Sequence, residues 1–184
     1  MSRDRHVTDD ELQRELRDLL TLAVVGDHVR WVLTGADASE LADWLGDAIV
    51  EWRAWADQVA KQLVASGVAP DGRVRSLAED LALNWVPDGW LEADEGRRLL
   101  GARLRRVAGW ACYRRSQATG PHSAVLDVIC SGLQAQLRSR PDLAAVQSPG
   151  GDPNEGATAP EERAHEDESR AHAAKEESSP TTAP

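Results

Sequence analysis

The segment from residue 41 to residue 63 carries the strongest periodic pattern in the chain and predicts a long amphipathic helix. Its apolar side chains recur in steps of three and four, the spacing that places residues on one helix face. They are Leu41, Leu45, Ala48, Trp52, Trp55, Val59 and Leu63. Ser66 and Gly67, with Pro70 just beyond, end the pattern in the manner of a helix C-terminus.

The flanking segments predict three more long helices and a crossover. A capping box at residues 8–11 (TDDE) begins a helix that reaches about residue 33, and residues 37–40 (DASE) are predicted to cap the periodic helix. Further helices are predicted over 92–118 and 121–138, and a short helix over 74–83 lies between two turn signals. Two helices, a long crossover and two more helices are the layout of an all-α, ferritin-like four-helix bundle.

The charge of the chain is concentrated at its C-terminal end. The formal net charge is −10, and residues 141–184 hold ten acidic against three basic residues, which leaves −3 for the rest. This stretch has almost no apolar side chains to offset the entropy of ordering, so we expect it to be disordered. The predicted organisation is a short arm (1–7), a bundle (8–140) and an acidic tail (141–184).

Several classes of protein are disfavoured by simple features of the sequence. No apolar run is long enough to span a bilayer, and the N-terminus does not resemble a secretory signal, so we expect a cytoplasmic protein. The acidic balance argues against non-specific DNA binding, which requires clustered Lys and Arg. Cys112 and Cys130 lie in separate predicted helices, and we expect both to be reduced thiols.

Four short motifs, in the right order, resemble those of the Dps mini-ferritins. They are GDHVRWVLTG at 26–35, EWRAWADQVA at 51–60, SGVAPDGR at 66–73 and GLQAQL at 132–137. The resemblance covers about residues 12–140. It implies a dodecameric hollow shell that oxidises ferrous iron with peroxide at sites on two-fold subunit interfaces and stores the iron inside. It also implies a role in stress physiology and DNA protection, and for many members DNA binding near the nucleoid.

The resemblance also assigns positions to the family's iron ligands, and most of them are lost here. The first-helix His falls on Arg30, the second-helix His and Asp fall on Ala42 and Gly46, and a distal acidic pair falls on Asp57 and Lys61. Only Asp57 keeps a ligand side chain, because iron oxidation sites use carboxylates and imidazoles and cations cannot serve. In the family the first-helix and distal positions meet across the two-fold axis, so we predict an intersubunit ion pair between Arg30 and Asp57 in place of metal.

Other residues offer alternative interpretations. A relocated metal site would use His28, Asp43 and Asp47, although these residues point away from the family positions and Asp43 and Asp47 also suit a solvated acidic pair. The seven Trp residues are predicted to pack in the core and interfaces rather than to stack on bases. The arginines between 97 and 115 are predicted to form a solvated face balanced by acids.

Two functions are therefore expected from the sequence. The first is a Dps-like shell subunit with a degenerate ferroxidase site and no expected cofactor, which forms its own cage or joins an active paralogue. The second is a working iron-oxidising and iron-storing Dps with relocated ligands, for which iron is the metal.

Overall fold

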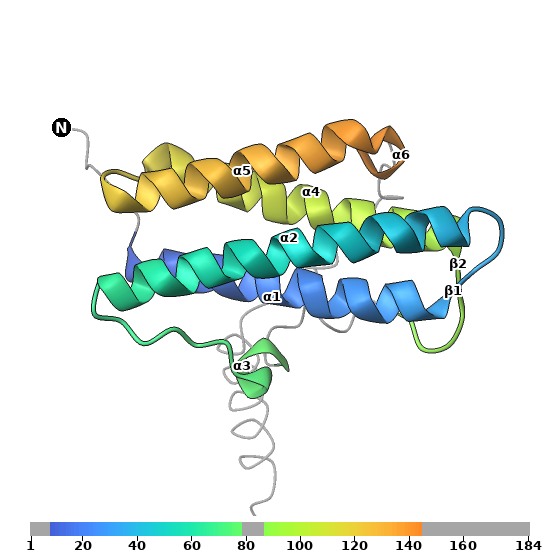
Figure 1. The fold of residues 1–184 in the computed structure, drawn as a ribbon, viewed down its shortest axis with the longest axis horizontal. Helices are drawn as coiled ribbons and strands as arrows, with labels where there is room; N and C mark the ends of the chain where they lie inside the picture. The colour runs from blue at the N-terminus through green and yellow to red at the C-terminus, as the bar shows by residue number, and fades with distance from the viewer. Residues whose placement is uncertain (1–7, 79–86, 145–184) are drawn as a thin grey trace, which may run out of the picture. The chain divides into compact units, whose positions relative to one another are not determined.

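The computed structural model describes residues 8–78 and 87–144, and within them four long helices form a bundle (Figure 1). The long helices are α1 (Asp9–Val32), α2 (Ala38–Ala65), α4 (Ala93–Gln117) and α5 (Pro121–Ser139). Two short helices, α3 (Val74–Ala78) and α6 (Pro141–Ala144), accompany them, and β1 (Leu33–Thr34) pairs in parallel with β2 (Leu91–Glu92). The predicted ferritin-like bundle, with a short helix in its crossover, is confirmed; residues 79–83 of that predicted helix lie outside the described residues.

The ends of the first two helices show which capping predictions were right. Thr8 and Glu11 form the reciprocal capping box, with Glu11 Oε2 accepting from the Thr8 amide at 3.0 Å. At the start of α2 the predicted side-chain cap is wrong, because Asp37 makes no capping hydrogen bond. Asp37 has a left-handed backbone conformation, and its carboxylate lies 3.4 Å from Arg97 on α4. At the end of α2, Gly67 takes the positive φ that a helix stop of this kind requires.

The core lies between the two helical hairpins, α1–α2 and α4–α5 (Figure 1). Trp52 of α2 is the largest fully buried side chain, and its Nε1 donates to Gln136 Oε1 on α5 at 2.9 Å. Gln136 in turn donates to Glu51 at 2.6 Å, so a polar chain crosses from one hairpin to the other. A Cβ at Gly132 would overlap the ring of Trp55, and glycine therefore permits the close approach of α5 to α2.

The two cysteines form a disulfide, which overturns the prediction of reduced thiols. Cys112 on α4 and Cys130 on α5 are bonded, with their Cα atoms 4.9 Å apart. The prediction failed because the two predicted helices are antiparallel neighbours joined by a short turn. An 18-residue separation across that turn returns the chain to the same level of the hairpin.

The folded region also extends past the predicted boundary at residue 140. Residues 141–144 form α6, and Leu143 is completely buried against the core. A Cβ at Gly101 would overlap the Leu143 backbone, so the glycine in α4 permits α6 to pack closely against it. Pro141 begins α6 and does not end the ordered region, because proline favours the first position of a helix. The remainder of the predicted tail and the N-terminal arm lie outside the described residues. Among the helices that are described, none combines the length and apolar character needed to cross a bilayer.

Candidate functional site

The residues at the three proximal family positions lie close together on α1 and α2. Arg30 is exposed near the end of α1, and its guanidinium lies over Gly46 of α2. A Cβ placed on Gly46 would be 3.8 Å from Arg30 Nη1, which is ordinary van der Waals contact. Ala42 is half-buried one turn before Gly46. A cation and two side chains without ligand atoms therefore occupy this place.

The two distal positions lie further along α2 and pair with each other. Lys61 Nζ is 2.6 Å from Asp57 Oδ2, an ion pair of the i,i+4 type on an exposed helix surface. The ammonium therefore partly neutralises the one retained family carboxylate. The structure does not bring Arg30 to Asp57 within one chain. Gly46, beneath Arg30, is eleven residues before Asp57, or about 16 Å along a helix.

We call the exposed surface formed by Val24 and Trp31 of α1 with Val50, Asp57 and Lys61 of α2 the α1–α2 face. Trp31 and Val50 are 69% and 68% exposed, which is unusual for large apolar side chains. The residues recur at helical spacing on each helix, so they line up in two adjacent stripes.

One ion pair joins the two stripes of the α1–α2 face. Asp27, between Val24 and Trp31, accepts from Arg53 of α2 at 2.5 Å. Arg30 itself makes no ion pair with any residue that the structure describes.

The residues of the alternative metal site do not gather around a common point. His28, Asp43 and Asp47 are all exposed side chains. Over residues 8–78 and 87–144 of a single chain, no three His, Cys, Asp or Glu side chains are placed to hold a metal ion together.

A buried ionic cluster, which the sequence reasoning missed, links α1 to α4. Glu15 is completely buried and accepts from Arg114 Nη1 at 2.6 Å, and Asp18 accepts from the same nitrogen at 3.1 Å. Arg103 is 3.7 Å from Asp18. Burial raises the pKa of Glu15 to about 7, despite the opposing effect of the Arg114 guanidinium.

The expectation of a solvated arginine face is therefore only partly right, because Arg103 and Arg114 are buried. The sequence of α1 contains an indication of this buried cluster, because Glu15 occupies a core position of the apolar stripe between Leu12 and Leu19. A carboxylate at such a position needs a cation from a facing helix.

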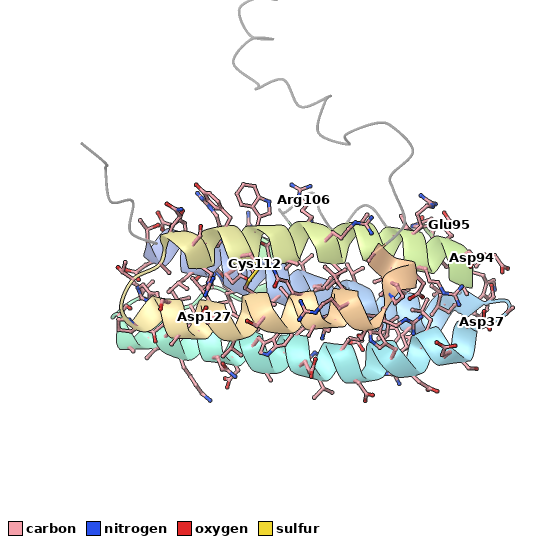
Figure 2. The ribbon with its side chains drawn as sticks, turned by 90° about the horizontal axis from the view of Figure 1, so that it is seen from above. Asp37, Asp94, Glu95, Arg106, Cys112 and Asp127 are labelled. Carbon is pink, nitrogen blue, oxygen red and sulfur yellow. A yellow bond between two sulfur atoms is a disulfide. The ribbon has the colours of Figure 1, made fainter. Side chains whose placement is uncertain are left out.

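A second ionic cluster occupies the end of the bundle near the α1–α2 turn. Figure 2 shows Asp37, Asp94 and Glu95 together at this end. Arg97 is 2.6 Å from Asp94 and 3.4 Å from Asp142, and Arg140 is 2.6 Å from Asp142. The open hollow among them, about 810 Å³, is thus lined by five carboxylates and three arginines, and the arginines are paired with carboxylates of the same lining.

The tryptophans divide between core and surface. Trp52 and Trp55 are buried, as predicted, and Trp44 packs edge-to-face on Trp52 with ring centroids 6.3 Å apart. Trp31, Trp90 and Trp110 are instead exposed. Trp85 lies outside the described residues.

Comparison with known proteins supports the fold assignment. No family model matches the chain. The Dps92 protein of Deinococcus radiodurans has a similar structure, with a TM-score of 0.68 and 19% identity over 84% of this chain and 94% of that one. The Dps of Microbacterium arborescens, in a structure described as the high iron form, gives a TM-score of 0.65 and 18% identity over 73% and 91% of the two chains.

A curated relative matches the sequence over a shorter stretch. The fine tangled pili major subunit of Haemophilus ducreyi is 27% identical over 95 residues, which are 52% of this chain and 50% of the relative. The chain thus spans about half the length of that protein. The structural matches show that the chain has the ferritin-like fold of the Dps proteins.

Proposed function

We propose that this chain is a shell subunit of a Dps-like cage whose family ferroxidase site no longer oxidises iron. The observation that carries the proposal is the position of Arg30 over Gly46, with Lys61 bound to Asp57. Two cations stand where the resemblance places iron ligands, and a cation repels Fe²⁺ and has no lone pair to offer. The residues present therefore do not fit an iron site. The protein acts as a structural or accessory component of the cage.

An iron-oxidation assay tests this proposal directly. Purified protein is loaded anaerobically with Fe²⁺ and then given hydrogen peroxide, and oxidation is followed by absorbance. We expect the rate to equal that of the protein-free solution. A variant with all four lost positions restored (Arg30→His, Ala42→His, Gly46→Asp and Lys61→Glu) should oxidise iron faster, because the backbone that positions the ligands is retained.

The same assay identifies the alternative function. Rapid oxidation by the wild-type protein, abolished by His28→Ala or Asp57→Asn, would contradict the proposal and favour a working ferritin with relocated ligands. Gln58→Glu, an exposed change at the position beside Asp57, is the matched control for adding negative charge without restoring a ligand position.

We further propose that the α1–α2 face forms a two-fold contact between subunits. In such a contact residue i of one copy meets residue j of the other, and j meets i. If α2 pairs antiparallel with its copy around residues 50–53, Gly46 and its overlying Arg30 reach Asp57 of the second chain. Arg30, which has no ion pair within the described part of its own chain, then gains one, and Trp31 and Val50 lose their exposure to water.

Charge reversal tests this contact. Arg30→Asp and Asp57→Arg should each shift the assembly toward smaller species, because each places like charges across the interface. The double variant should restore assembly, measured as particle mass by analytical ultracentrifugation. Arg138→Asp, an exposed position on α5 outside the α1–α2 face, is the control for the change of net charge. Equal particle mass for both single variants and the wild type would contradict the contact.

The oligomeric state and the location of the protein complete the proposal. We propose a homo-oligomer, with a dodecamer as the expected size and a mixed shell with an active paralogue as the alternative. The mass of the protein purified alone separates these two possibilities.

A cytoplasmic location near the nucleoid is proposed by analogy, and DNA binding is disfavoured by the net charge of −10. The Cys112–Cys130 disulfide is uncommon in a reducing cytosol, so thiol titration of protein isolated under alkylating conditions tests the location.

A further inference from the structure

A positively charged pocket lies between α1, α3 and α4, away from the α1–α2 face. Its volume is about 440 Å³, within the range of small-molecule sites. Five arginines and two carboxylates line it, together with two aromatic rings and a serine. They are Arg14, Arg17, Arg103, Arg106 and Arg114; Glu11 and Asp18; Trp110 and Tyr113; and Ser76.

The walls of this pocket are held in place by contacts among the protein's own groups. Gln13 on α1 makes two hydrogen bonds to the Asp71 backbone, at 2.7 and 2.8 Å, and Arg17 lies 3.0 Å from the Asp71 carboxylate. These bonds hold the segment that leads into α3 against α1. The buried Arg114–Glu15 ion pair holds α4 against α1. A site built in this way is formed before a ligand arrives, which lowers the entropic cost of binding.

Two of the arginines remain available for an anionic ligand. Arg14 of α1 and Arg106 of α4 are exposed, and neither makes an ion pair or hydrogen bond with a residue described by the structure. Figure 2 shows Arg106 projecting outward from α4. Guanidinium groups bind the oxygens of phosphate in a forked, two-bond geometry, and two of them from opposite walls suit a single phosphate group.

The aromatic side of the pocket suits a planar ring. Trp110 and Tyr113 pack edge-to-face with centroids 5.8 Å apart, and the Arg114 guanidinium lies 5.8 Å from the Trp110 ring. Even so, Trp110 is 48% exposed and Tyr113 is 45% exposed. Exposed, mutually fixed aromatic rings next to free guanidinium groups are the surface on which nucleobases stack.

We propose that this pocket binds a nucleoside phosphate, with the phosphate held by Arg14 and Arg106 and the base against Trp110 and Tyr113. A single nucleotide is favoured over a polynucleotide for two reasons. The pocket volume of about 440 Å³ suits one nucleotide, and a strand needs many phosphate contacts whereas two pocket arginines are unpaired in the described part of the chain.

Calorimetry on the assembled wild-type protein tests the proposal, with ADP, adenosine, inorganic phosphate and a single-stranded 20-nucleotide DNA as probes. We expect saturable ADP binding with one site per chain. Adenosine and inorganic phosphate should each bind about tenfold more weakly or worse, because each lacks one half of the recognition. Tight binding of the DNA without saturable ADP binding would overturn the proposal in favour of a nucleic-acid surface. Equal affinity for phosphate and ADP would overturn the role of the rings.

Two substitutions separate the charged and the aromatic contributions. Arg106→Gln and Trp110→Ala should each weaken ADP binding about tenfold or more, while adenosine binding should respond only to Trp110→Ala. Arg138→Gln, an exposed arginine on α5 outside the pocket, is the matched control and should leave ADP binding unchanged. Since all three side chains are exposed, circular dichroism should show no loss of helix. ADP binding that is unaffected by both pocket variants would place any nucleotide elsewhere and overturn the assignment.

Discussion

Trp52→Ala is expected to lower the free energy of unfolding by about 3–5 kcal/mol, the range for removing a buried aromatic side chain. Trp52 is 1% exposed and packs against Gly26 on the neighbouring helix. Its removal leaves a cavity between the hairpins and deprives Gln136 of the indole N–H that donates to its Oε1. Both losses fall where a buried side-chain hydrogen bond joins α2 to α5.

Urea unfolding followed by circular dichroism measures this change. All variants are compared at one protein concentration, because assembly of subunits adds to apparent stability. Trp90→Ala is the matched control: Trp90 is 78% exposed, so its truncation should change stability by less than about 0.5 kcal/mol. A loss below about 1 kcal/mol for Trp52→Ala would show that the core does not pack around this side chain.

Arg114→Met should cost about 3 kcal/mol or more near pH 8.5, because it leaves the ionised Glu15 buried without its cation. The cost should be much smaller at pH 6. The pKa of Glu15 is raised from 4.5 to about 7 in the folded protein, so the folded state holds a proton there that the unfolded state has already released. Stability from this group is therefore lost as pH rises from about 4.5 through 7.

The pH dependence of the cost of Arg114→Met has the same origin. Arg114 lowers the pKa of Glu15, so without it that pKa rises further. At pH 6 Glu15 is then mostly neutral in both folded proteins, and the substitution costs mainly the Arg114–Asp18 contact. Above pH 7 the Arg114 guanidinium stabilises the ionised Glu15 in the wild type but not in the variant. The difference in the free energy of unfolding between the two proteins therefore grows.

Urea unfolding at the two pH values measures the difference between the proteins. Glu15→Gln combined with Arg114→Met should recover most of the loss at pH 8.5, since the buried carboxylate that Arg114 neutralises is then absent. Arg98→Met removes an exposed arginine paired with Glu95 and is the control. A deficit of the same size at pH 6 and pH 8.5 would contradict the role of Glu15.

The helices were predictable because their signals are local. The stripe from Leu41 to Leu63, the Thr8 capping box and the breaks at Gly67 and Pro121 each act within a few residues, and each falls where the structure begins or ends a helix. The features that sequence reasoning missed depend instead on which helices face each other. The Cys112–Cys130 bond and the Arg114–Glu15 pair join residues 18 and 99 positions apart.

The same distinction applies to the candidate site. Arg30, Gly46 and Asp57 were singled out by the resemblance to the Dps family, and the structure adds that Arg30 covers Gly46. Their expected meeting across an interface stays a prediction, because it depends on a second chain. The pocket at Arg106 and Trp110 arises where α4 meets α1 and α3, so periodicity along one helix did not reveal it.

The short β1–β2 bridge bears on how far the packing of the helices depends on the length of the crossover. Leu33 pairs with Leu91 and Thr34 with Glu92, so the start of α4 is fastened directly to the end of α1. The position of α4 in the bundle is thus held by this bridge, by core packing and by the Arg114–Glu15 pair, in addition to the chain that connects it to α2. Insertions that leave Asp71 and α3 in place against α1 carry mainly the slow growth of loop-closure entropy, about 0.6 kcal/mol for each doubling of loop length. Evolution or a protein engineer can therefore lengthen the crossover with little effect on the four-helix core.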